Sequence, residues 1–184
     1  LDYSFADEAL LHRALRHASL DVEDDNEHLE FLGDRVLGLV IAEELLARYP
    51  LEKEGDLARR QAELVSRRIC AEIAAEVNLD AVIRCDPSRH GGGDAPSRNI
   101  LANGCEAVLG AVYLDGGLQA AAKVILALWQ ERLDAQTDDL GVLFVLGAHL
   151  GELGGAVAHR AHRALQVGRD LREIAHGARG AGRG

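Results

Sequence analysis

The 184-residue chain has no methionine, only 4% aromatic residues and three cysteines. Scarce aromatics beside abundant Ala, Leu and Glu argue against a β-sandwich and favour helices. The cysteines are odd in number and form no Cys-x-x-Cys pair, which indicates a reduced, cytoplasmic setting. No apolar run approaches the roughly 20 residues that cross a bilayer, so we expect no membrane attachment. The missing methionine indicates a processed or partial product.

The chain is acidic, with a formal net charge of −10. Residues 1–136 hold 14 basic and 25 acidic residues, whereas residues 137–184 hold six Arg and five acids. Proteins that bind nucleic acids are usually basic, so this balance argues against such a partner. The exception is a protein whose acids hold divalent cations, because a bound metal inverts the local charge.

Residues 1–136 show helical periodicity with short breaks, and no stretch alternates as a strand would. We expect helices over residues 5–17, 27–49, 57–77, 100–113 and 118–133. Asn26 is a candidate N-cap, Pro50 ends the second helix, and the glycine-rich residues 86–99 form a loop. This part of the chain is therefore predicted to be an all-α domain.

Residues 137–184 differ in composition from the rest. They hold ten of the chain's 20 glycines and four of its eight histidines. The last residues, HGARGAGRG, are of low complexity. We expect an atypical Ala/Gly/Arg/His-rich tail without a packed fold.

The strongest chemical signal is the acidic segment NEHLEFLGDRVLG, residues 26–38. On a helix, Glu27, Glu30 and Asp34 lie within about 60° of one another on one face. No Lys or Arg between Asp21 and Asp34 relieves their repulsion. One interpretation is a solvated acidic face. The other is a site for a hard divalent cation such as Mg²⁺, since bulky apolar residues place these acids beside a core.

A second polar pair, Asn103 and Glu106, interrupts an otherwise apolar helix. These side chains could face the first acidic stripe from a neighbouring helix and complete an oxygen-rich site. Alternatively, Asn103 begins a helix as its N-cap, with Glu106 at the third helical position.

Three segments together resemble the bacterial ribonuclease III endonuclease domain. They are NEHLEFLGDRVLG (26–38), EGDLARRQAELVSR (54–67) and EAVLGAVYLDGG (106–117). The resemblance covers residues 1 to about 135 and implies an all-α, homodimeric bundle that holds double-stranded RNA. It also implies Mg²⁺-dependent hydrolysis of phosphodiesters by a two-metal mechanism, with Mn²⁺ as a substitute, in the processing of ribosomal, messenger and other structured RNA.

The resemblance assigns roles to individual residues. The metal ligands would be Glu30, Asp34 and Glu106, with Asn103 in the fourth ligand position and with Asp34 and Glu106 catalytic. Glu27 and Glu54 would be supporting acids, and Phe31 would lie in the dimer interface.

Four arginines are candidates for contact with the RNA backbone: Arg59, Arg60, Arg67 and Arg98. Arg60 and Arg67, seven residues apart, are expected on one face of the predicted helix over residues 57–77. The alternative is ordinary surface ion pairing, with partners such as Glu63 or Glu72.

The sequence departs from the family pattern in two ways. The family has Asp where this chain has Asn103, which predicts weaker metal binding and reduced cleavage. The usual C-terminal double-stranded-RNA-binding domain is not recognisable in residues 137–184, either through a frameshift or because the tail is specific to a lineage. Two functions follow: an active endoribonuclease, or a catalytically impaired dimeric module for RNA binding or assembly.

Overall fold

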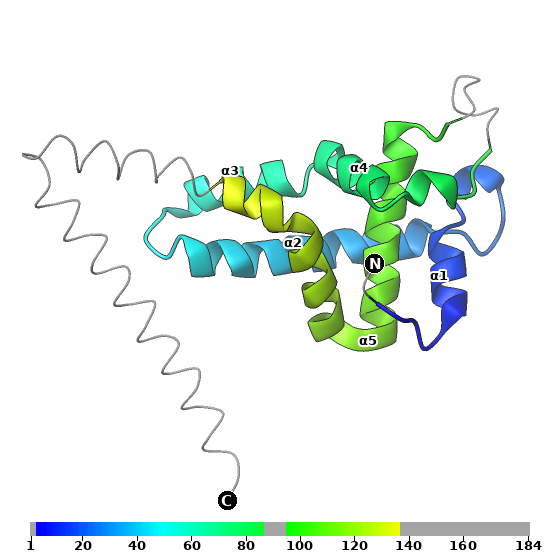
Figure 1. Ribbon diagram of the computed structural model, residues 1–184, viewed down its shortest axis with the longest axis horizontal. Helices are drawn as coiled ribbons and strands as arrows, with labels where there is room; N and C mark the ends of the chain where they lie inside the picture. The colour runs from blue at the N-terminus through cyan, green and yellow to red at the C-terminus, as the bar shows by residue number, and fades with distance from the viewer. Residues whose placement is uncertain (1–2, 87–94, 137–184) are drawn as a thin grey trace, which may run out of the picture.

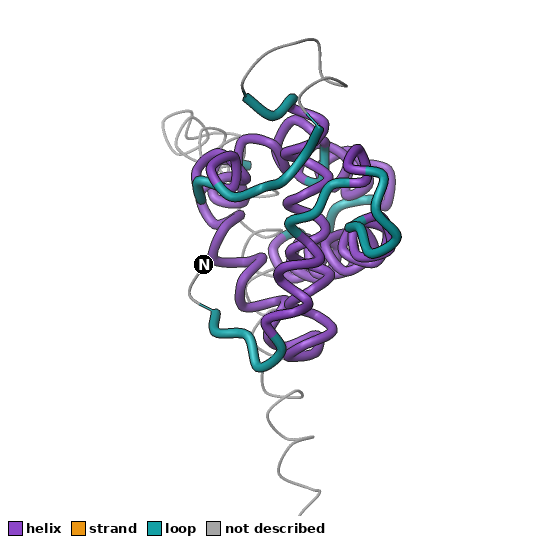
Figure 2. Tube along the Cα trace, turned by 90° about the vertical axis from the view of Figure 1, so that its right-hand side faces the viewer, coloured by secondary structure: helices purple, strands orange, loops and turns teal. Residues whose placement is uncertain are grey.

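The computed structural model describes residues 3–86 and 95–136 (Figure 1). Its helices are α1 (Glu8–Ala14), α2 (Glu27–Arg48), α3 (Glu54–Leu64), α4 (Arg67–Glu76) and α5 (Arg98–Ala135), with short 3₁₀ turns at Ala18–Leu20 and Leu79–Ala81. The described part of the chain contains no strand, as Figure 2 also shows, so the all-α prediction is confirmed. The predicted tail, residues 137–184, lies outside the described residues, as do residues 87–94 of the predicted loop.

The prediction of one helix over residues 57–77 is wrong. The chain forms two helices there, because Ser66 begins a new one: its side-chain oxygen accepts a hydrogen bond from the Ile69 amide at 3.4 Å. α3 therefore ends at Leu64 and α4 begins at Arg67. Because of this break, α4 is a separate helix from α3, and it packs on α5.

Asn26 precedes α2 but does not cap it through its side chain. The Asp25 carboxylate accepts a hydrogen bond from the Glu27 amide at 3.0 Å instead. The Asn26 side chain is buried and its Nδ2 donates to the Ala14 carbonyl oxygen at 3.3 Å. Asn26 thus ties the end of α1 to the beginning of α2.

α5 is the central helix, and it bends at Gly117, as the prediction of a break at residues 115–117 required (Figure 1). Gly117 has φ of +75°, a conformation that favours glycine. Beside the bend, the Asp115 carboxylate accepts hydrogen bonds from the Ala6 and Asp7 amides at 2.9 and 2.8 Å. Beyond it, buried Trp129 donates through Nε1 to the Leu64 carbonyl oxygen at 2.9 Å. These bonds fix both halves of α5 to the rest of the fold.

The most extensive helix contact joins α2 to the first half of α5. Their backbones meet at Gly33 and Gly110. A Cβ on Gly33 would lie 1.7 Å from the Glu106 carbonyl oxygen, and a Cβ on Gly110 would lie 2.2 Å from the Leu29 carbonyl oxygen. Only glycine at both positions permits this close crossing, which brings the first two turns of α2 beside Glu106.

By length and composition, α5 is the one helix in residues 3–86 and 95–136 that is apolar enough to cross a membrane. It is bent at Gly117 and packs against α1, α2 and α4. Trp129, Ile125 and Val112 are fully buried within this packing. These residues of α5 belong to the core of the helical domain.

Replacing Gly33 with alanine is expected to destabilise the fold by about 3 kcal/mol or more, because the new methyl group meets backbone atoms that cannot rotate away. Gly55→Ala is the matched control. No atom lies within 4 Å of a Cβ at Gly55, so this substitution is expected to stabilise α3 by about 0.5–1 kcal/mol. Urea unfolding of both variants measures the difference, and equal stabilities would contradict the close crossing.

Candidate functional site

The acidic residues singled out in the sequence meet in one cleft between α2, α4 and α5. Its volume is about 530 Å³. It is lined by Glu27, Glu30, Phe31 and Asp34 of α2, by Arg67 of α4, by Asn103 and Glu106 of α5, and by Val65. The acidic face of α2 and the polar pair of α5, Asn103 and Glu106, therefore line the same cleft.

Glu106 has the most perturbed environment in this cleft. Glu106 is only 8% exposed to solvent. Burial, helped by the nearby carboxylates of Asp34 and Glu30, raises the pKa of Glu106 from its usual value near 4.5 to about 7, although the Arg67 guanidinium opposes the rise. A carboxyl group with this pKa is half protonated near neutral pH. Burial also raises the pKa of Glu30, again against the effect of Arg67.

Asn103 lies inside α5, five residues after Arg98, the first residue of the helix. Ser97 caps this helix by accepting a hydrogen bond from the Ile100 amide at 3.5 Å, so the alternative in which Asn103 is the N-cap is wrong. The Asn103 Oδ1 atom is buried and has no hydrogen-bond partner among the described residues. A buried amide oxygen without a donor is available as a ligand for a hard cation.

This donor set fits Mg²⁺, which prefers carboxylate and amide oxygens and keeps several of its waters. Among residues 3–86 and 95–136, no three acidic, histidine or cysteine side chains already lie close enough together to enclose a metal ion. The oxygens of Glu30, Asp34 and Glu106 therefore surround a cleft wide enough for a hydrated cation.

Arg35 is a neighbour that the sequence argument missed, although it directly follows Asp34. Its guanidinium lies 2.7 Å from Asp34 Oδ2, and its Cζ lies 5.4 Å from the centre of the Phe31 ring. Both partners of the ion pair are more than one-third exposed, so the pair contributes only about 0–1 kcal/mol. Arg35 therefore partly balances the charge of Asp34, while Asp34 still lines the cleft.

The thiols of Cys70 and Cys105 lie beneath Glu106, and both are buried and free. Cys70 forms a hydrogen bond with the Glu106 carboxylate, and this bond lowers the pKa of Glu106. The Cys70 Sγ atom also donates to the Val65 carbonyl oxygen at 3.9 Å. The pKa of Cys105 is raised well above its usual range by Cys70 and by burial, so this thiol stays protonated. Cys105 thus packs as a small buried hydrophobic residue.

Four predicted site residues lie away from the cleft, and two of them, Arg59 and Arg60, line a second cavity. Glu54 is the first residue of α3 and Arg98 the first residue of α5; both are exposed. Phe31 lies at the edge of the cleft and is 67% exposed, unusually high for a large apolar side chain. Such exposure leaves the Phe31 ring available to a partner.

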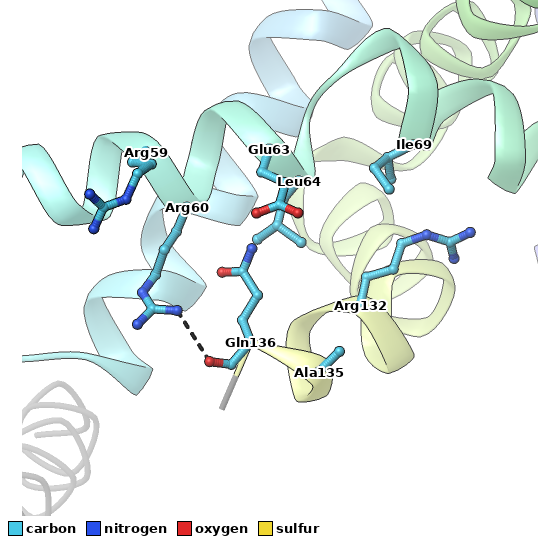
Figure 3. Close-up of a pocket in the computed structure, with 8 residues that line it drawn as sticks. All are labelled: Arg59, Arg60, Glu63, Leu64, Ile69, Arg132, Ala135 and Gln136. Atoms are coloured by element: carbon cyan, nitrogen blue, oxygen red, sulfur yellow. Dashed lines mark hydrogen bonds between the residues drawn. The ribbon is translucent and has the colours of Figure 1, made fainter. Parts of the chain in front are cut away.

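Arg59 and Arg60 line a second cavity, of about 350 Å³, where α3, α4 and the end of α5 meet (Figure 3). Arg60 forms a two-pronged ion pair with Glu52 at 2.8 and 2.9 Å and donates to the Gln136 carbonyl oxygen at 3.1 Å. Arg59 pairs with Asp56 at 2.8 Å. Ion pairing thus accounts for both arginines, with partners other than Glu63 and Glu72. The expectation that Arg60 and Arg67 share a helical face is wrong, because they belong to different helices.

Comparison with known proteins agrees with this architecture. The sequence model described as ribonuclease-III-like matches residues 7–133. Ribonuclease 3 of Jannaschia sp. (strain CCS1) is 46% identical over 141 residues, which are 76% of this chain and 62% of that protein. Ribonuclease 3 of Caulobacter vibrioides (strain NA1000 / CB15N) is 46% identical over 138 residues, 73% of this chain and 60% of that protein. The chain thus spans about three-fifths of the length of these curated relatives.

Solved structures show the same fold. The nuclease domain of ribonuclease III from Campylobacter jejuni, described as flexible in a region involved in dimer formation, matches with a TM-score of 0.66 and 37% identity. The match covers 70% of this chain and 90% of that one. Dicer from Pichia stipitis matches with a TM-score of 0.58 at 22% identity, over 72% of this chain and 59% of that one, which shows the fold alone. The chain belongs to the ribonuclease-III-like family.

Proposed function

We propose that the chain is a Mg²⁺-dependent endoribonuclease that hydrolyses phosphodiester bonds in double-stranded RNA. The observation that carries the proposal is the cleft in which Glu30, Asp34 and Glu106 converge from two helices, in a chain of the ribonuclease-III-like family. Ribosomal, messenger and other structured RNAs of the cytoplasm are the proposed substrates.

Glu30, Asp34, Asn103 and Glu106 would hold the cation in this proposal, and Glu27 would add negative charge at the rim. Two bound Mg²⁺ ions, or Mn²⁺ in their place, would supply activation of water and stabilisation of the departing 3′ oxygen. Glu106 must release its proton before it can serve as a ligand. The close crossing at Gly33 and Gly110 keeps the two helices, and hence their oxygens, in fixed relation.

The raised pKa of Glu106 gives a pH dependence with a definite sign. The folded protein holds the Glu106 proton more tightly than the unfolded chain does. The contribution of this group to the free energy of unfolding is therefore fully present below about pH 4.5 and is lost as the pH rises through about 7. Glu106→Gln is expected to unfold at higher temperature than the parent at pH 8 and to lose this component of the pH dependence. Mg²⁺ should stabilise the parent far more at pH 8 than at pH 5, and at pH 8 it should stabilise Glu106→Gln much less than the parent. Thermal melts at these pH values measure both effects; identical curves for the two proteins would contradict the assignment.

A specific observation supports a second function. Asn103 removes one negative charge from the ligand set that the family pattern predicts. A protein with this site would hold Mg²⁺ weakly. It could therefore serve as a catalytically impaired dimeric module that binds or assembles RNA.

Incubation with long duplex RNA distinguishes the two functions. We expect short fragments with Mg²⁺ and none with EDTA, and none from Asp34→Asn, which loses a ligand charge with little change in volume. Asn103→Asp should cleave at lower Mg²⁺ concentration than the parent, because the added charge strengthens cation binding. Intact but gel-shifted RNA with the parent, and cleavage restored by Asn103→Asp, would establish the impaired module instead. Equal rates and equal Mg²⁺ dependence for the parent and Asn103→Asp would contradict a metal-ligand position for residue 103.

We also propose that the chain forms a homodimer through the outward face of α2. Phe31, Leu39 and Leu46 are 67%, 54% and 59% exposed and lie within about 80° of one another on this helix. Arg35 is the charged side chain between Phe31 and Leu39 on this face. Several large exposed apolar side chains on one helix face are typical of an interface. Exposed Glu54 is proposed to support the second metal or the site of the partner.

Leu46→Asp is expected to weaken the dimer by about tenfold or more, since it places a charge in a buried apolar contact. Leu46 does not line the acidic cleft, so metal binding by the monomer should be unaffected. Val82→Asp, at another exposed apolar residue outside α2, is the control and should leave association unchanged. Sedimentation velocity over a concentration series measures both variants. A parent that remains monomeric at high concentration would refute the dimer.

A further inference from the structure

Arg67 is the one basic residue among the described side chains that line the acidic cleft. It is the first residue of α4, directly after Ser66, whose side chain caps the helix. Its charge is felt by the acids opposite, since it lowers the pKa of both Glu30 and Glu106. The break between α3 and α4 is what points this residue into the cleft.

The arginines of α3 and α4 differ in whether their charge is already neutralised. Arg59 pairs with Asp56, Arg60 with Glu52, and Arg68 with Glu72, at 2.8, 2.8 and 3.0 Å. Arg67 has no carboxylate within ion-pair distance and makes no hydrogen bond to any residue that the structure describes. Its guanidinium donors are therefore uncommitted, although four carboxylates surround the same cleft.

An uncommitted guanidinium at this place suits a phosphate better than any other ligand. Its planar fork matches two oxygens of a phosphate, and it keeps its charge at every physiological pH. Glu30 and Glu106 would repel an RNA strand that entered the cleft. Metal ions bound by the acids would neutralise the phosphates nearest to them, and a basic side chain on α4 would neutralise a phosphate that these ions do not reach.

We propose that Arg67 binds the non-bridging oxygens of an RNA phosphate at the acidic cleft, and that in the RNA-free protein it serves as counter-ion to Glu30 and Glu106. The inference rests on the proposed function and deepens it, because it selects one RNA contact from the four arginine candidates. It has a consequence of opposite sign for the two ligands. Removing Arg67 should weaken RNA binding but strengthen Mg²⁺ binding, since the same positive charge attracts one and repels the other.

The experiment uses the full chain with Arg67→Ala and Arg67→Lys, and with Arg68→Ala as the matched control. Arg68 is the next residue on the same helix, is exposed, and is paired with Glu72. Fluorescence anisotropy with a short blunt RNA duplex in Ca²⁺ measures binding over a range of salt. Arg67→Ala should bind about tenfold more weakly and lose about one unit of the slope of log Kd against log salt. Arg67→Lys should keep the slope but cleave more slowly in Mg²⁺, and Arg68→Ala should match the parent.

Calorimetry with Mg²⁺ alone provides the second readout. Arg67→Ala should bind the ion about threefold more tightly than the parent or Arg68→Ala. An unchanged RNA affinity for Arg67→Ala, or an equal loss in Arg68→Ala, would overturn the phosphate contact. If the parent itself binds no duplex, the proposed function fails; tighter Mg²⁺ binding by Arg67→Ala would then still support the counter-ion role, and unchanged Mg²⁺ binding would overturn it.

Discussion

The crossing of α2 and α5 at Gly33 and Gly110 is the constraint on which the candidate site depends. Helices normally pack at 8–10 Å between axes because side chains separate them. Here no Cβ lies between the two backbones, so Leu29 and Glu106 carbonyl oxygens sit against glycine. Acids from two helices are thereby held around one cleft.

The same crossing imposes an electrostatic cost. Carboxylates that would disperse in solution are kept together beside apolar packing, and the pKa of Glu106 rises to about 7 as a result. Arg35 relieves Asp34 through an exposed ion pair, and Arg67 acts on Glu30 and Glu106 from across the cleft. In the proposed function, both arginines would yield to a divalent ion or to a phosphate.

The remainder of the domain holds the helices that carry this cleft. Asn26 anchors the beginning of α2 to α1, and Trp129 anchors the second half of α5 to the end of α3. Ser66 then starts α4, which places Cys70 beside Glu106 and Arg67 on the lining of the same cleft. In contrast, Arg59 and Arg60 on α3 serve surface ion pairs, where local charge is already balanced.

The sequence by itself determined the helical class and the acidic face of α2, because the spacing of Glu27, Glu30 and Asp34 places them together on any helix. It also placed Asn103 and Glu106 on one face of α5, and it indicated the bend near Gly117. It did not reveal the break at Ser66, because helical periodicity continues across that residue. Only the tertiary structure decided which arginine faces the acids, since that depends on the angle at which α4 packs on α5. Local spacing fixes which side chains share a helix face, whereas packing between helices fixes what each face meets.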